Sequence, residues 1–246
     1  MIALRFTYLD NAATTMVAPE VLDAMLPYLK GEYGNPATHL SYALGARAQA
    51  AVDKGRQQVA SLINAKHADE VLLTSGGTES DNWALWCAVA NAKRKHIVTS
   101  AIEHHAVLET ATALANEIPG VDATVLPVDA EGRVSPEALR GAVRDDTAIV
   151  SIMHANNEVG TIQPIKELAA IAHAKGALFH TDAVQSVGKI PVDVQELEVD
   201  MLSLSGHKLH APKGVGAMYA RKGTRLRPLI HGGGQERNLR SGTTNV

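Results

Sequence analysis

The most informative stretch of this chain is VDMLSLSGHK, which runs from Val199 to Lys208. Its apolar part predicts a buried strand over Met201–Leu204, and that strand leads through small residues to Lys208. A lysine in this place loses hydration, so its ammonium form is disfavoured and its amine becomes a nucleophile. Such an amine suits a Schiff base with a carbonyl compound. The alternative is a solvated loop lysine, and the choice depends on the rest of the chain.

Around this stretch, short apolar runs alternate with longer helical patterns. The expected strands are Val71–Thr74, His96–Thr99, Thr124–Pro127, Ala148–Met153, Ala177–Thr181, Met201–Leu204 and Gly216–Ala220. The expected helices are Glu79–Asn91, Ala106–Glu117, Pro136–Arg140 and Ile165–Lys175, the last ended by Gly176. Several strands are apolar on both faces and are separated by helices, which predicts an α/β domain with a mainly parallel sheet flanked by helices. A mostly helical segment, residues 10–65, is expected to precede it.

Composition narrows the class of protein. Of the 246 residues, 46% are hydrophobic and 20% are charged, which is typical of a soluble globular protein. The net charge is −3 and the basic residues are scattered, so we expect no nucleic-acid partner. No apolar stretch is long enough to span a bilayer, and no signal or transit segment is visible. With Cys87 as the single cysteine, these features predict a cytoplasmic location and no membrane partner.

A glycine-rich turn, TSGGTES at residues 74–80, joins the first expected strand to its helix. Glycines let the backbone approach a ligand closely, and a helix N-terminus offers free N–H groups and positive potential. Thr78 adds a hydroxyl, so the turn is typical of a phosphate cradle. The alternative is a simple turn in which Thr78 or Ser80 caps the helix.

Polar side chains follow three other strands. Asp182 comes directly after one of them, where open α/β sheets bind ligands, and a carboxylate there would keep a pyridine nitrogen protonated. Asn156 and Asn157 could bond a ring substituent, whereas His104 and His105 suit proton transfer or ring stacking. Taken singly, an aspartate at this position is more often a cap or turn residue, and an Asn-Asn pair is usually a turn. The histidine spacing does not favour a metal site, and none is predicted.

Together, these four groups match one cofactor. A phosphate cradle, a carboxylate, polar ring contacts and a dehydrated lysine are all expected at the same edge of the sheet. They are the parts of a site for pyridoxal 5′-phosphate, so we predict an enzyme that uses this cofactor.

Several motifs, in this order, resemble those of one known family. They are Tyr8–Thr15, Gly34–Pro36, Thr74–Asn82, Glu103–His104, Asn156–Glu158, Asp182–Gly188, Ser205–Lys208 and His231–Glu236. The chain is similar to cysteine desulfurases of the class V aminotransferase group, from Tyr8 to Val246. The resemblance implies the large domain of a fold-type I pyridoxal-phosphate enzyme, with a seven-stranded sheet. Residues 16–246 would form this domain, and residues 1–15 would join a C-terminal small domain that the chain lacks.

The resemblance also implies roles for individual residues. Lys208 resembles the Schiff-base lysine, Asp182 the partner of the ring nitrogen, and His104 a group that stacks on the ring and moves protons. The other expected cofactor contacts are Gly77, Thr78, Ser205 and His207 at the phosphate, Asn157 and Gln185 near the ring hydroxyl, and Gly206. Thr243 matches a phosphate contact that reaches the neighbouring subunit's site, which implies a homodimer.

The implied reaction converts L-cysteine to L-alanine and passes sulfur to an enzyme cysteine persulfide. Sulfur acceptors or scaffold proteins of iron–sulfur cluster or thio-cofactor assembly would be the partners. The family's catalytic cysteine lies downstream of the segment matching Arg240–Thr243, and Cys87 reads as a buried, inert thiol. We therefore expect these 246 residues to bind cofactor and to transfer no sulfur. The alternatives are a selenocysteine lyase, another class V enzyme, or a truncated chain without activity.

Overall fold

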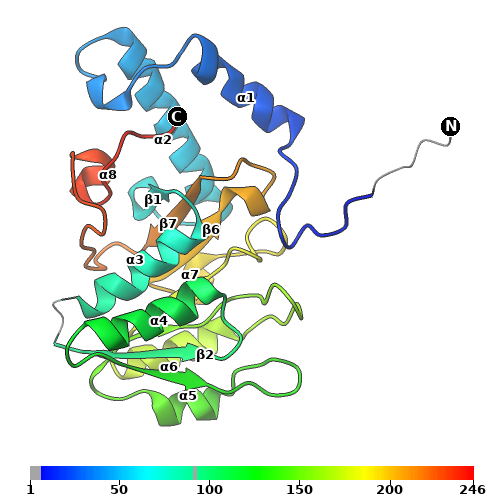
Figure 1. The fold of residues 1–246 in the computed structure, drawn as a ribbon, viewed down its shortest axis with the longest axis vertical. Helices are drawn as coiled ribbons and strands as arrows, with labels where there is room; N and C mark the ends of the chain where they lie inside the picture. The colour runs from blue at the N-terminus through cyan, green and yellow to red at the C-terminus, as the bar shows by residue number, and fades with distance from the viewer. Residues whose placement is uncertain (1–6, 91–92) are drawn as a thin grey trace.

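A computed structural model describes residues 7–90 and 93–246 (Figure 1). Its centre is a seven-stranded sheet with the strand order β1-β7-β6-β5-β4-β2-β3. The strands are β1 (Val71–Thr74), β2 (His96–Ser100), β3 (Asp122–Leu126), β4 (Thr147–Ser151), β5 (Leu178–Asp182), β6 (Met201–Ser205) and β7 (Gly216–Ala220).

Strand direction decides where the loops meet. The pairs β2–β3, β2–β4, β4–β5 and β5–β6 are parallel, and β7 runs antiparallel to both β1 and β6. This confirms the predicted mainly parallel sheet. Because β7 reverses between them, β1 and β6 run in the same direction, so every strand except β7 ends at one edge of the sheet. The loops that follow these strands therefore gather there.

Helices cover both faces of the sheet. One face packs against α3 (Gly77–Val89) and α4 (His105–Glu117). The other packs against α5 (Pro136–Ala142), α6 (Ile165–Ala174), α7 (Val194–Leu197) and the end of α2 (Ala43–Leu62).

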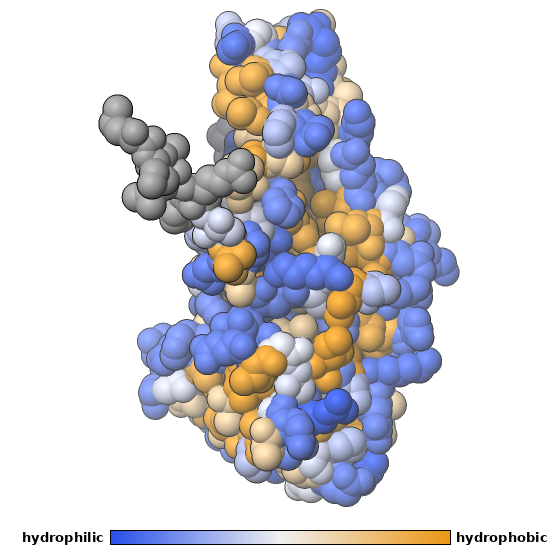
Figure 2. Space-filling model, turned by 90° about the vertical axis from the view of Figure 1, so that its right-hand side faces the viewer, coloured by the Kyte–Doolittle hydropathy of each residue, from blue (hydrophilic) through white to orange (hydrophobic). Residues whose placement is uncertain are grey.

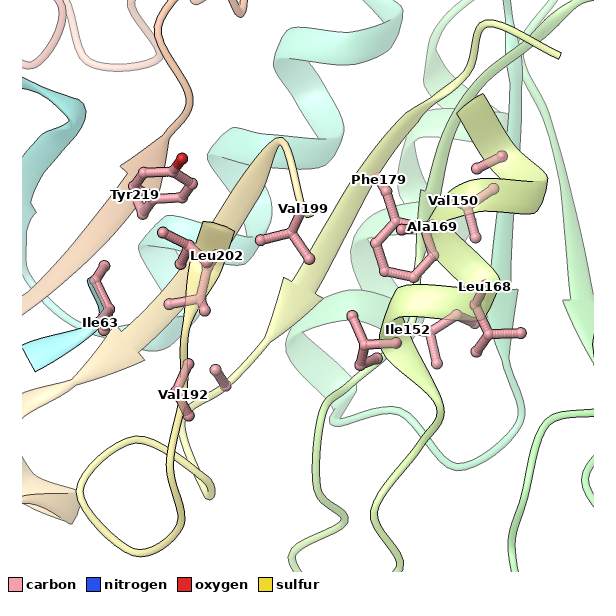
Figure 3. Close-up of a cluster of buried hydrophobic side chains, with 14 of the residues drawn as sticks. Ile63, Val150, Ile152, Leu168, Ala169, Phe179, Val192, Val199, Leu202 and Tyr219 are labelled. Atoms are coloured by element: carbon pink, nitrogen blue, oxygen red, sulfur yellow. The ribbon is translucent and has the colours of Figure 1, made fainter. Parts of the chain in front are cut away.

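Consecutive residues of a strand point their side chains to opposite faces of the sheet. Ile149 belongs to the cluster under α3, whereas Val150 packs with Phe179 and Leu168 on the α6 side (Figure 3). A strand buried on both sides must therefore be apolar at consecutive positions, and the sequence shows this pattern.

The remaining elements are α1 (Pro19–Lys30), α8 (Gln235–Asn238) and three short 3-10 turns, η1 (Pro36–Thr38), η2 (Ala68–Glu70) and η3 (Gly206–Lys208). Helices α1 and α2 confirm the predicted helical segment before the domain. None of the described helices is long and apolar enough to cross a membrane.

Several element boundaries differ from prediction. Helix α3 begins at Gly77 rather than Glu79, because the glycine turn itself opens the helix. Its expected end at Asn91 lies outside the described residues. Strand β3 begins at Asp122 and ends before Pro127, because proline has no N–H group to donate to a neighbouring strand.

Apolar side chains lie exposed near the N-terminal helices. Figure 2 shows apolar surface in the upper part of the molecule, where Figure 1 places α1. Helix α1 has no buried residue, and the exposed apolar side chains on it and after it are Leu22, Leu29, Tyr33, Leu40 and Tyr42.

Candidate functional site

A cavity of about 720 Å³ lies at the edge where the strands end. Nine of the eleven residues predicted to catalyse or to bind cofactor line it: Gly77, Thr78, His104, Asn157, Asp182, Gln185, Ser205, His207 and Lys208. Gly206 and Thr243 do not line it. Gly206 is buried beneath, where its N–H donates to the carbonyl of Val215, and Thr243 lies exposed outside.

Lys208 lies on the turn that follows β6 and is half-buried. Burial lowers the pKa of its ammonium, and the nearby charge of Lys189 lowers it further, while Asp10 and Asp182 oppose this. The Nζ atom donates to the carbonyls of Ala12 and Ala13. The amine is thus partly dehydrated and more available as a nucleophile than that of a surface lysine.

Asp182 closes β5 and is buried at the floor of the cavity. Burial raises the pKa of its carboxyl, whereas the N–H of Val184, 2.8 Å from Oδ1, and the charges of His104 and Lys208 oppose the rise. The group therefore has partners that favour its charged form in an apolar surrounding.

The glycine turn brings α3 close to the strand ends. A Cβ on Gly77 would lie 2.6 Å from Val184 Cγ2, so only glycine lets the helix start pack against the loop after β5. No side chain caps the N-terminus of α3, and the N–H groups of its first turn stay available at the cavity wall. This is the arrangement that binds anions at helix N-termini.

Glu79 ties this turn to a distant segment. Burial acts against ionisation, but bonds from Arg240 and Ser75 hold the pKa of its carboxyl below the ordinary value. Arg240 Nε and Nη2 lie 2.8 and 3.0 Å from the Glu79 oxygens, and the Ser75 N–H is 2.8 Å away. The negative charge of Glu79 is therefore balanced by Arg240, so this carboxylate does not repel an anion at the start of the helix.

Three other predicted residues are held by neighbours. His104 lines the cavity, but its Nδ1 accepts from the N–H of Ala106, 3.1 Å away, and so caps α4. The ring therefore caps a helix, a role that the sequence did not predict, in addition to lining the cavity. Gln185 donates to the Ala12 carbonyl at 2.8 Å, and His207 Nδ1 pairs with Thr14 Oγ1 at 3.0 Å.

Several groups at this site have no role predicted from the sequence. Asp81 lines the cavity about one helical turn after Gly77, and a single aspartate within a helix gives no sequence signal of this place. The Ala12 and Ala13 carbonyls lie within the motif Tyr8–Thr15, but a backbone oxygen leaves no mark in a sequence. Among the described residues, no three His, Cys, Asp or Glu side chains come together as a metal site.

Cys87 is buried, as the sequence predicts. It lies in α3, and its thiol exchanges hydrogen bonds of 3.2 Å with the backbone of Arg227. Burial raises the pKa of this thiol to about 11, so it remains protonated and unreactive near neutral pH.

Comparisons with known proteins agree with the geometry. The family described as Aminotransferase class-V matches residues 7–246. A protein named Cysteine desulfurase IscS, from Methanosarcina thermophila, is 53% identical over 241 residues, which are 97% of this chain and 58% of the relative.

Two solved structures are similar in fold. One is described as a NifS-like protein and has a TM-score of 0.93 at 46% identity, covering 98% of this chain and 66% of its own. The other is described as SspA in complex with cysteine and has a TM-score of 0.91 at 40% identity. The match covers 97% of this chain and 69% of that one. The chain spans 58–61% of the length of the first curated relatives. These findings confirm the predicted resemblance.

Proposed function

Because the chain belongs to the class V aminotransferase family, we propose that it is the cofactor-binding part of a cysteine desulfurase that uses pyridoxal 5′-phosphate. One observation carries the proposal: the Lys208 amine, the Asp182 carboxyl and the open start of α3 line a single cavity. Each group alone has an ordinary structural explanation. Their convergence has the chemistry that this cofactor requires.

The residues fit the cofactor. The cavity of about 720 Å³ is of the size that small-molecule ligands occupy. The first N–H groups of α3, with Thr78, Ser205 and His207, would hold the phosphate. Asp182 would face the ring nitrogen, Gln185 and Asn157 the ring hydroxyl, and Lys208 would bond the aldehyde carbon. Gly206 would support this contact from beneath.

When bound, the cofactor supplies a charged ring that withdraws electrons from the substrate's α-carbon. The protein's part is to keep that ring charged and to move protons. Asp182, whose charged form is favoured by the N–H of Val184 and the charges of His104 and Lys208, would hold the proton on the ring nitrogen. The Lys208 amine would take up and return a proton beside the α-carbon, and His104 would assist from the cavity.

The proposed reaction takes L-cysteine to L-alanine. The substrate's C–S bond breaks, the carbon gains a proton, and the sulfur forms an S–S bond with an acceptor thiol. Cys87 does not suit this role, because it is buried and protonated. The acceptor thiol would therefore come from outside these 246 residues. Sulfur acceptors and scaffold proteins of iron–sulfur cluster assembly would be the partners, which the relatives' names support.

We also propose a homodimer. The exposed apolar side chains around α1 would be covered by a partner, and Thr243, outside its own cavity, would reach the phosphate of the second subunit. Residues 16–246 would form the cofactor domain. The segment Asp10–Thr15 would close over the cavity from the other domain.

Absorbance spectroscopy tests the cofactor assignment. Mixing the protein with pyridoxal phosphate should produce a band near the visible edge that borohydride removes. Lys208→Ala should lose the band, whereas Lys166→Ala, at an exposed position on α6, should keep it. An unchanged band in Lys208→Ala would refute the role of this lysine. The reaction is then tested by adding an acceptor thiol and measuring the release of alanine, first from cysteine and then from selenocysteine.

A further inference from the structure

Three carboxyl groups are buried together beneath the cavity. They belong to Asp81 on α3, Glu103 in the turn after β2, and Asp182 at the end of β5, and each is at most 6% exposed. When ionised, Asp182 and Glu103 both act against a negative charge on Asp81. Three ionised carboxylates in one apolar place would repel one another strongly, so protons must remain on some of them.

Asp81 has few contacts that would favour its charged form. Its Oδ1 has no hydrogen-bond partner although it is buried. Burial raises the pKa of Asp81 well above the ordinary value, the charge of Asp182 raises it further, and a bond with Ser203 opposes this only in part.

The imidazole of His180, close to Asp81, supplies no positive charge. Its Nε2 lies 3.6 Å from Asp81 Oδ1, but its two nitrogens are already engaged with Ser151 at 2.8 Å and Ser203 at 2.9 Å. Burial lowers the pKa of this imidazole to about 3, so it is neutral at physiological pH.

Asp182 stands in a different electrostatic setting. It accepts the N–H of Val184, and the charges of Lys208 and His104 favour its ionised form. The two groups whose charges act on Asp81, Asp182 and Glu103, are both carboxyls. When two coupled carboxyls hold one proton, the proton stays on the one without cationic neighbours.

We propose that Asp81 is a positioning residue that holds a proton at neutral pH, and that it thereby keeps the negative charge under the cavity on Asp182. This inference deepens the proposed function, because a ring nitrogen needs an ionised partner. Glu103 is a second proton holder in the same cluster: its Oε1 accepts from Ser100 and Met153, its Oε2 is unpartnered, and burial raises its pKa to about 8.

Infrared spectroscopy of the chain as purified tests the proton on Asp81. Protonated carboxyls have a carbonyl stretch that carboxylates lack. At pH 7 the wild type should show this band, and Asp81→Asn should lose part of it. Asp53→Asn, at an exposed position on α2, should leave it unchanged. A band of undiminished intensity in Asp81→Asn would contradict the proposal.

Carbon-13 NMR of aspartate side chains places the charge directly and does not depend on the variant folding. At pH 7 the Asp81 carboxyl carbon should have the shift of an acid and that of Asp182 the shift of a carboxylate. The pKa of Asp182 should also stay the same in Asp81→Asn, because a neutral amide replaces a neutral acid. A charged Asp81 with a protonated Asp182, or a lower pKa of Asp182 in Asp81→Asn, would overturn the proposal. Since neither measurement uses turnover, failure of cofactor binding would refute the proposed function separately.

Discussion

At the scale of single residues, the close packing at Gly77 makes a sharp prediction. A methyl group there would lie 2.6 Å from Val184 Cγ2, so Gly77→Ala must move the valine or the helix start. Overpacking of this kind costs about 1–3 kcal/mol. We expect cofactor affinity, measured by absorbance titration, to fall about tenfold or more. Gly55→Ala on α2 has nothing within 4 Å and should bind as the wild type does. Equal affinity for Gly77→Ala would mean that the turn does not hold the phosphate.

Glu103 predicts a pH dependence of stability. Burial raises the pKa of this carboxyl to about 8, from 4.5. Between these values the folded state keeps a proton that the unfolded state releases, so rising pH favours unfolding by about 1.4 kcal/mol per unit. Glu103→Gln cannot titrate. In urea unfolding from pH 5 to 8, the wild type should lose stability relative to Glu103→Gln, and parallel pH profiles would contradict this.

Side chains that follow strands could be predicted from sequence, and those inside helices could not. Lys208, Asp182 and Gly77 stand where a strand ends, so the strand pattern itself placed them at one edge. Asp81 lies within a helix, where a single aspartate is typical of a solvated face. Its burial depends on how α3 packs against β5 and β6, which no local pattern shows.

At the scale of elements, an ion pair joins α8 to α2 and β1. Arg56 Nη1 and Nη2 lie 2.7 Å from the two Glu236 oxygens, and Glu236 also accepts the N–H of Leu73 at 3.0 Å. Both side chains are nearly buried. Glu236→Ala would leave a buried guanidinium without a counter-charge, at a cost of about 3–5 kcal/mol.

Urea unfolding measures this cost. Glu137→Ala removes an exposed carboxylate and should change stability little. A loss for Glu236→Ala no larger than that of Glu137→Ala would show that the pair does not hold these elements together.

The elements themselves were largely predictable, but their pairing was not. The apolar runs predicted all seven strands within a few residues, because most of the strands are buried on both faces and need continuous apolar residues. The antiparallel direction of β7, between β1 and β6, leaves no such mark, since the same apolar run fits either direction.

At the scale of the whole molecule, the N-terminal segment closes over residues far along the chain. Thr15 Oγ1 donates to the His207 carbonyl at 2.9 Å and accepts the N–H of His210 at 2.8 Å, and the side chain is buried. Thr15→Val keeps the shape but leaves the N–H of His210 without its partner, while the His207 carbonyl keeps only the backbone N–H of residue 15. We expect a loss of about 1–3 kcal/mol in unfolding free energy.

Thr15→Val should also weaken cofactor binding, because η3 carries Lys208. Thr112→Val on α4, whose hydroxyl bonds only within its helix, is the control. If Thr15→Val has the same unfolding free energy and the same cofactor affinity as the control, the N-terminal segment does not position Lys208.

The most direct test of the account is to map the site at which the cofactor attaches. The protein is mixed with pyridoxal phosphate, reduced with borohydride, digested and analysed by mass spectrometry. The partly dehydrated amine at position 208 should carry the reduced pyridoxyl group in nearly all labelled molecules. Labelling mainly at Lys213 or Lys189, or scattered over surface lysines, would contradict the claim that the strand-end lysine is the reactive group.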